Sequence, residues 1–406
     1  MLYYRLGGIK MPERQDFTKI PVGQLGIIAL PGCEKVAEKI DSYLVKWRKE
    51  RESEHKDTIQ FAGYERDTYV INASFPRFGS GEGKCVIKET VRGFDVFILC
   101  DPFNYGVEYK MYGRYVPMSP DDHYANLKRA ISAIAGKARR ITVIMPMLYE
   151  GRQHRRTSRE SLDCADMLRE LCISYGVDNI ITFDAHDPRV QNAVPQSGFE
   201  NVQPVYQMIK AICKNVDDLK IDNNHMMVIS PDEGGMGRCI YFSSVLGLDL
   251  GMFYKRRDYS VIIDGRNPIV AHEFLGSNVE GKDVIIIDDM ISSGDSMIEV
   301  ATKLKELKAN RIFICASFGL FCNGLETFDK AYADGLISKV FTTNLIYSTP
   351  ELLSREWYVN VDLSKYCSYV IDTLNHDDSI SELLDPKERI HNLLSKYGFE
   401  SHITNK

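Results

Sequence analysis

The feature that most limits the possible folds is a regular alternation of short apolar runs with amphipathic helical stretches. The apolar runs have the length expected of buried strands, and they occupy 25–30, 95–101, 141–145, 179–183, 225–230, 249–254, 283–288, 311–317 and 339–344. Helical patterns fill the intervals at 34–47, 161–176 and 296–310, and in the last of these apolar residues recur at helical spacing. Strands that alternate with helices predict parallel sheets covered on both faces, with ligands at the carboxyl ends of the strands.

The pattern runs through two such units, one before and one after about residue 195. With 406 residues and 44% hydrophobic content, the chain can bury two cores. We expect a solvated charged segment at 48–57, an aromatic-rich loop at 104–123, and a tail with helical patches after about residue 350.

Composition excludes several classes of function. A net charge of -6 argues against a general binder of nucleic acid or of membrane surfaces. The ten cysteines form no C-x-x-C pair and show no zinc-finger spacing, and we expect them to be reduced, mostly core residues. No stretch reaches the roughly 20 apolar residues of a membrane span, and the first residues lack the apolar centre of a signal peptide. We therefore expect a cytoplasmic protein.

The segment VIIIDDMISSGDS, residues 284–296, carries the clearest chemistry. Asp288 and Asp289 end the apolar run, and small polar residues lead to a helix expected to begin near Ser296. Backbone N–H groups of such a loop and of a helix N-terminus bind anions, and two carboxylates beside them can accept hydrogen bonds from vicinal hydroxyls. This combination predicts a sugar-phosphate site; the alternative is an ordinary capped turn.

This segment resembles the PRPP-binding signature of type I phosphoribosyltransferases, and the remaining motifs resemble the ribose-phosphate pyrophosphokinase (PRPP synthetase) family. The resemblance implies an α/β fold with two phosphoribosyltransferase-like domains, at 20–195 and 196–346, followed by a helical extension at 347–406. It also implies transfer of the β,γ-diphosphate of ATP to the 1-hydroxyl of ribose 5-phosphate, with Mg²⁺. The ribose hydroxyls and the 5-phosphate would bind to Asp288, Asp289, Ser292, Ser293, Gly294, Asp295 and Ser296.

Two further strand ends supply candidate metal ligands. His186 stands between two aspartates in ITFDAHDPRVQ, where a neutral imidazole can bind a metal when a carboxylate orients it. A lone histidine at such a place is more often a surface or capping residue. The family has a similar D-x-H segment whose histidine contacts the metal of Mg-ATP, and its S-P-D-x-G-G segment matches Asp232 in VISPDEGGMGR.

The resemblance implies ATP contacts at two places, each with a departure from the family pattern. Arg152 and Gln153 match the family's Arg-Gln, but His154 follows where an acidic residue is usual. Phe78 and Glu82 match the loop that stacks on adenine, but Ser80 replaces its aspartate.

The resemblance also implies a catalytic lid. Lys255 and Arg257 in FYKRRDYS match the spacing of a mobile family loop that closes over the transferring phosphates. Cations at that point stabilise developing charge during phosphoryl transfer. Without the resemblance, the triplet Lys-Arg-Arg is ordinary surface charge.

Three alternatives stay open beside the synthetase: a phosphoribosyltransferase that consumes PRPP, a catalytically silent homologue that regulates a true synthetase, and a DNA-binding regulator with the same fold. The amino-terminal motifs argue against the first, the retained His186 and lid cations against the second, and the absence of a basic domain against the third. Family members self-associate, so we also expect a homo-oligomer. No Walker A loop is present, which excludes an ATP site of the P-loop kind.

Overall fold

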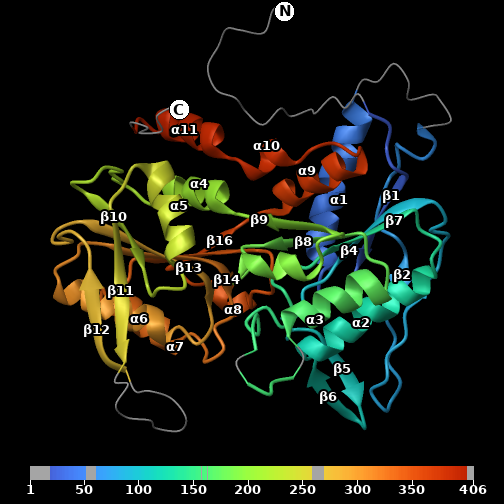
Figure 1. Cartoon of the computed structure of the whole chain (residues 1–406), viewed down its shortest axis with the longest axis horizontal. Coiled ribbons are helices and arrows are strands. Elements are labelled where there is room, and N and C mark those ends of the chain that lie inside the picture. The colour runs from blue at the N-terminus through green and yellow to red at the C-terminus, as the bar shows by residue number, and fades with distance from the viewer. Residues whose placement is uncertain (1–18, 52–60, 157, 162, 258–268, 400–406) are drawn as a thin grey trace, which may run out of the picture.

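The computed structural model describes residues 19–51, 61–156, 158–161, 163–257 and 269–399, with backbone alone at 255–257 and 269–272. It consists of two α/β halves that lie side by side, each built on its own sheet (Figure 1). The predicted fold class is confirmed: both sheets are mostly parallel and both are flanked by helices.

The first sheet has the order β1-β4-β7-β8-β9, and every neighbouring pair is parallel. Its strands are β1 (Gln24–Ala29), β4 (Phe94–Leu99), β7 (Arg140–Ile144), β8 (Asn179–Phe183) and β9 (Gly198–Val202). Two small hairpins project from this half, β2 (Ala73–Ser74) with β3 (Val86–Ile87) and β5 (Glu108–Met111) with β6 (Arg114–Pro117).

The second sheet has the order β12-β11-β10-β13-β14-β15-β16, with only β12 antiparallel to its neighbour. Its strands are β10 (Met226–Ser230), β11 (Leu250–Arg257), β12 (Ile269–Leu275), β13 (Asp283–Ile291), β14 (Ile312–Gly319), β15 (Lys339–Thr343) and β16 (Tyr358–Val361).

Helices cover both faces of each sheet (Figure 1). They are α1 (Glu34–Glu50), α2 (Pro120–Ile134), α3 (Cys164–Arg169), α4 (Val205–Asn215), α5 (Met236–Leu246), α6 (Asp295–Glu306), α7 (Glu326–Ala333), α8 (Pro350–Leu353), α9 (Ser364–Asn375), α10 (Ser381–Leu384) and α11 (Lys387–Lys396). Among the described helices, none combines the length and apolar character needed to cross a bilayer.

One hydrophobic core is shared by the two halves. Alternate residues of each strand point to opposite faces, so Ile27 of β1 and Ile285 of β13 join a common core, whereas Ile28 joins the core under α2 and α3. A third core lies between the second sheet and α6 and α7. The halves are therefore held together by buried apolar surface.

Several expectations about the segments between the predicted strands were wrong. The region expected as an aromatic loop at 104–123 contains the β5–β6 hairpin and the start of α2, which Ser119 caps by accepting a hydrogen bond from Asp122 N–H. Strand β13 continues to Ile291, three residues beyond Asp288. The strands β9 and β16 were missed because they lack a continuous apolar run, and β16 lies inside the expected helical extension.

The ten cysteines are all free, as expected; Cys322 is exposed, Cys85 is half-buried, and the others are buried.

Part of the charged segment expected to be solvated is instead buried. Arg48 is 1% exposed and donates hydrogen bonds to Asp372 and Asn375 of α9, and Arg51 binds the other oxygen of Asp372. Burial alone would raise the pKa of Asp372, but the charges of the two arginines hold it at about 2. The remaining residues of that charged segment, 52–57, lie outside the described residues.

We predict that Asp372→Asn lowers the free energy of unfolding by about 3–5 kcal/mol, because two buried guanidinium groups lose their counter-charge. Denaturant unfolding followed by circular dichroism measures the loss. Asp67→Asn is the matched control, since it removes an exposed pair with Lys49 of α1 and should change the stability little. Equal effects of the two substitutions would contradict the structural importance of this buried group.

Candidate functional site

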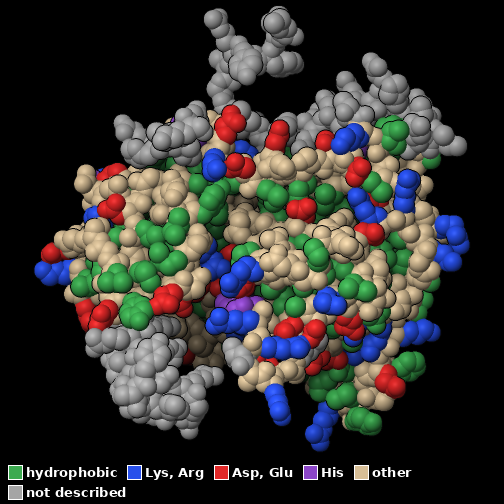
Figure 2. Space-filling view, in the orientation of Figure 1, with side chains coloured by type: hydrophobic (Ala, Val, Ile, Leu, Met, Phe, Trp, Pro, Cys, Tyr) green, Lys and Arg blue, Asp and Glu red, His purple; other side chains and the backbone are tan. Residues whose placement is uncertain are grey.

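The carboxyl ends of β8 and β13 meet between the two halves and bring the predicted residues of both together. His186 Nδ1 lies 2.7 Å from Asp289 Oδ2, and Asp289 is only 3% exposed. The two residues are separated by 103 positions in the sequence. In the space-filling view, histidine and basic side chains gather in the hollow between the halves (Figure 2).

Arg238, in the first turn of α5, is the central cation of this cluster. Its Nε donates to Asp184 Oδ1 at 3.2 Å, and its Nη1 lies 3.5 Å from Asp288 Oδ1 and 4.0 Å from Asp289 Oδ1. Sequence reasoning missed this residue, although it closes the segment VISPDEGGMGR. The sequence did carry a signal for Arg238: a basic residue in the first turn of a helix that follows directly after a strand end.

The environment separates the pKa values of the two adjacent aspartates. Burial and the neighbouring charge of Asp289 raise the pKa of Asp288 well above its usual range. Burial also acts on Asp289, but the hydrogen bond with His186 and the charge of Arg238 hold its pKa below the usual range. The same hydrogen bond raises the pKa of His186 against the opposing effect of burial. These opposite pKa shifts favour an ionised Asp289 beside an Asp288 that is more easily protonated.

Asp184 adopts a backbone conformation that residues other than glycine seldom occupy, with φ of 41°. Its carboxylate accepts from Arg238 and from Ser317 Oγ at 2.6 Å, and its N–H donates to Val202 O. Burial raises the pKa of this carboxyl. Asp184 therefore acts as a buried link from β8 to the second half.

The loop 292–296, which we predicted to bind an anion, leads directly into α6. Gly294 has φ of +92°, and a Cβ there would lie 2.2 Å from the ring of Phe328, so only glycine fits. The helix begins at Asp295; its N-cap residue Gly294 has no side chain to cap it, and the N–H of Asp295 donates to Ser293 Oγ at 3.4 Å. The other N–H groups of the first turn are donors of the kind that bind phosphate at a helix N-terminus. Arg152 of the first half reaches this loop, with Nη1 3.3 Å from Ser292 Oγ.

Asp232 and Gln153 lie near this region but have local partners. Asp232 Oδ1 accepts from the backbone N–H groups of Gly234 and Gly235. Gln153 Nε2 donates to Glu160 at 3.3 Å. In the described part of the chain, Gln153 makes no hydrogen bond to the carboxylate cluster of Asp184, Asp288 and Asp289.

The loop carrying Phe78 and Glu82 is attached elsewhere. Arg77 binds Asp122 of α2, Tyr112 N–H donates to Gly79 O, and Ser80 Oγ donates to Glu82 Oε2 at 2.8 Å. Phe78 is 58% exposed. Among the contacts of the described residues, none joins this loop to the carboxylate cluster.

The predicted lid falls at the end of β11. The backbone of Lys255 pairs with His272 and that of Arg257 with Ile269, with a register shift between Arg256 and Arg257. The side chains of these residues lie outside the described part of the structure.

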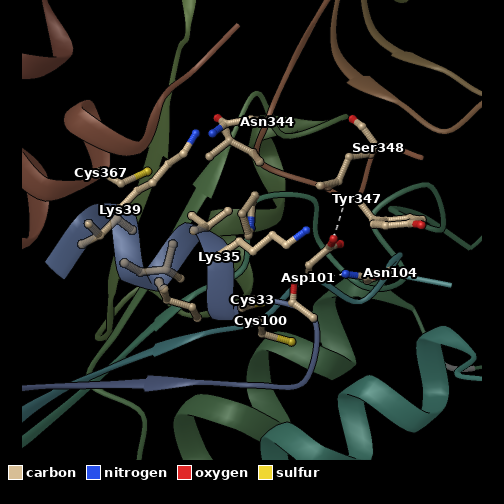
Figure 3. Close-up of a pocket in the computed structure, with 18 of the residues that line it drawn as sticks. Cys33, Lys35, Lys39, Cys100, Asp101, Asn104, Asn344, Tyr347, Ser348 and Cys367 are labelled. Atoms are coloured by element: carbon tan, nitrogen blue, oxygen red, sulfur yellow. Dashed lines mark hydrogen bonds between the residues drawn. The ribbon is translucent and has the colours of Figure 1, made fainter. Parts of the chain in front are cut away.

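A separate cavity of about 260 Å³ lies between the halves, away from the predicted site residues (Figure 3). Asp101 lies in its wall. Its carboxylate accepts a hydrogen bond from the backbone N–H of Phe103 and one, across the halves, from the backbone N–H of Tyr347 at 2.7 Å. Burial raises the pKa of Asp101 to about 7. The carboxylates of Asp184, Asp288 and Asp289, by contrast, border cavities of only about 20 and about 10 Å³, because their ion pairs occupy the space between them.

Two mostly parallel sheets, with an acid pair ahead of a small-residue loop in the second, define an α/β protein of the phosphoribosyltransferase type. Residues 25–174 match the model of the N-terminal domain of ribose phosphate pyrophosphokinase, and residues 195–352 match the phosphoribosyl transferase domain. The chain belongs to the PRPP synthetase family.

Relatives named ribose-phosphate pyrophosphokinase align over most of the chain. The protein of Vibrio parahaemolyticus is 28% identical over 322 residues, which cover 77% of this chain and 91% of that relative. The protein of Rhodopirellula baltica is 29% identical over 314 residues, covering 76% and 88%. The solved structure of phosphoribosylpyrophosphate synthetase from Mycobacterium smegmatis is similar in fold, with a TM-score of 0.67 and 19% identity, covering 87% of this chain and 99% of that one.

We predict that Arg238→Met lowers the free energy of unfolding by roughly 3–5 kcal/mol at pH 7, because it leaves the buried carboxylates of Asp184 and Asp289 and the half-buried one of Asp288 without their cation. Carboxyls with raised pKa values take up protons in the folded state more readily than in the unfolded state, so the loss should shrink as the pH falls from 7 to 5. Denaturant unfolding at both pH values tests this.

Arg355→Met serves as the control for the Arg238 substitution, since Arg355 pairs with Asp329 and Glu351 at the surface. Its effect should be small at either pH. A loss for Arg238→Met that is the same at pH 5 and pH 7 would show that lost packing, and not uncompensated charge, is responsible.

Proposed function

We propose that the chain is a ribose-phosphate diphosphokinase, which transfers the β,γ-diphosphate of ATP to the 1-hydroxyl of ribose 5-phosphate and releases AMP. The observation that carries this proposal is the contact of His186 and Arg152 of the first half with Asp289 and Ser292 of the sugar-phosphate segment. A phosphoribosyltransferase site needs the second half alone. Here the first half supplies polar groups at the place where a second substrate would meet the sugar phosphate.

The sugar phosphate would bind to the second half. Asp288 and Asp289 would accept hydrogen bonds from the vicinal ribose hydroxyls. The backbone N–H groups and hydroxyls of Ser292, Ser293, Gly294, Asp295 and Ser296 would hold the 5-phosphate at the N-terminus of α6. In this arrangement the 1-hydroxyl would face His186 and Arg152.

The donor groups present are compatible with Mg²⁺. Asp289 orients His186 through Nδ1, leaving Nε2 for a metal, and Asp232 offers a carboxylate from the neighbouring strand end. Within the described residues, no three His, Cys, Asp or Glu side chains converge as a complete metal site. Phosphate oxygens and water would complete the coordination, as is usual for Mg²⁺ with nucleotides, and the bound ion would neutralise phosphate charge.

In the proposed reaction, the 1-hydroxyl oxygen of ribose 5-phosphate attacks the β-phosphorus of ATP. The bond from that phosphorus to the oxygen bridging the α and β phosphates breaks, AMP leaves, and the hydroxyl proton passes to solvent. Lys255 and Arg257, together with Arg152 and Gln153, would position the polyphosphate and neutralise the charge that develops.

Adenine would bind to the loop of Phe78 and Glu82. Because this loop packs on α2 and the β5–β6 hairpin and leaves Phe78 exposed, we propose that it completes the site of a second copy in a homo-oligomer. The unpaired cysteines agree with a cytoplasmic setting, and the negative net charge agrees with small-molecule substrates and not nucleic acid or membrane.

The first prediction from this proposal concerns the products. Incubation with ATP, Mg²⁺ and ribose 5-phosphate should yield AMP and PRPP in equal amounts, and AMP should not form when ribose 5-phosphate is omitted. Chromatographic separation of the nucleotides, with PRPP assayed separately, makes the measurement. ADP as the product would overturn the proposal. A folded protein that binds ribose 5-phosphate but forms no product would support the silent homologue.

A second prediction concerns the lid. Lys255→Ala and Arg257→Ala should each lower kcat on the order of a hundredfold, because they remove charge that acts on the transition state. The affinity for ribose 5-phosphate, measured by calorimetry, should stay nearly unchanged. Arg256→Ala is the control from the same triplet and should have a mild effect. Three mild and equal effects would identify these residues as ordinary surface charge.

A further inference from the structure

His154 is placed beside the proposed metal ligand although no assigned role accounts for it. It follows Gln153 in the loop after β7, and its ring centroid lies 5.5 Å from that of His186, with 54° between the ring planes. Its side chain is 21% exposed, so the ring lies mostly under the surface of the hollow between the halves. Two imidazoles, from the loops after β7 and β8, thus lie beside each other.

Three ring nitrogens of the two histidines make no hydrogen bond to the described residues: Nε2 of His186 and both nitrogens of His154. His186 uses Nδ1 for Asp289, and in the described part of the chain its Nε2 makes no hydrogen bond. His154 Nδ1 is buried without a hydrogen-bond partner among the described residues, and its Nε2 lies 3.7 Å from Asp187 Oδ2, beyond hydrogen-bond distance. Buried polar nitrogens are normally paired, because leaving one unpaired costs free energy.

The separation of the rings suits a shared metal ion. When two imidazole nitrogens each lie about 2.1 Å from one ion, the ring centroids are roughly 5 Å apart at common ligand angles. The observed 5.5 Å is close to that distance. A direct hydrogen bond between the two rings is not found, and the tilt of 54° is not a parallel stack.

The donor atoms also bear on which ion would bind. Imidazole is a better ligand for first-row transition ions than for Mg²⁺, which prefers oxygen, and affinity rises from Mn²⁺ to Co²⁺. The hydrogen bond that His186 Nδ1–H donates to Asp289 would strengthen His186 as a ligand. A second imidazole therefore shifts the preference of the site away from Mg²⁺.

We propose that His154 and His186 together ligate one divalent ion, and that the chain binds Co²⁺ or Mn²⁺ in preference to Mg²⁺ at the metal position of the proposed nucleotide site. This inference rests on the proposed function for its location, because phosphate oxygens and water would supply the remaining ligands. It assigns to His154 a role as a specificity-determining ligand.

The first test uses the wild-type chain. Pulsed EPR of the Mn²⁺-loaded protein, with and without α,β-methylene-ATP, counts the imidazole nitrogens bound to the ion. Two are expected in the presence of the analogue. One or none would overturn the proposal, without reference to any variant.

The second test compares variants by Co²⁺ titration, followed through visible absorption, with Mg²⁺ affinity measured by competition. His154→Gln should weaken Co²⁺ binding roughly tenfold or more and Mg²⁺ binding less than about twofold. His154→Asp, which supplies oxygen, should weaken Co²⁺ while retaining Mg²⁺. The control His225→Gln, a histidine outside the site that pairs with Asp222, should change neither affinity.

The outcomes separate this inference from the proposed function. Unchanged Co²⁺ affinity in His154→Gln, or equal loss of both ions in His154→Gln and His154→Asp, would overturn the role of His154. Two bound imidazoles in a chain that makes no PRPP would support the metal site and reject only the diphosphokinase. PRPP formation with a single bound imidazole would support the diphosphokinase and reject His154 as a metal ligand.

Discussion

The guanidinium of Arg238 is the charge on which the site depends. Three buried or half-buried carboxylates converge on it, Asp184 from the first sheet and Asp288 and Asp289 from the second. Without a cation among them, their mutual repulsion and desolvation would oppose the approach of the two sheets. The ion pairs therefore do two things at once: they fix the halves to each other, and they keep Asp289 ionised opposite His186.

The sequence predicted the sheets well because central parallel strands are buried on both faces and read as continuous apolar runs. The expected strand at 179–183 is β8 as found, and the others agree within a few residues. Edge strands such as β9 and β16 escaped detection because one side of each is only partly buried, so their composition is mixed. The β5–β6 hairpin was taken for a loop because its strands are short and polar.

Part of the site could also be foreseen, because strand ends of parallel sheets collect functional groups. His186 and Asp289 were predicted for one site and lie in contact. The role of Arg238 could not be predicted from the sequence, because it depends on three carboxylate partners that only the fold brings together. The departures at Ser80 and His154 were visible in the sequence, but only the structure shows that Ser80 bonds Glu82 and that His154 faces His186.

The pairing of Arg48 with Asp372 spans 324 positions of the chain, and this has a consequence for biosynthesis. At roughly 5–20 residues per second, a ribosome needs about 16 to 65 seconds to add that length. During this interval Arg48 of α1 and Arg51 at its C-cap lack the counter-charge that α9 will supply. The nascent first half must therefore keep that face of α1 hydrated or covered by another protein, and its final packing is a late event that awaits release of the last helices from the ribosome.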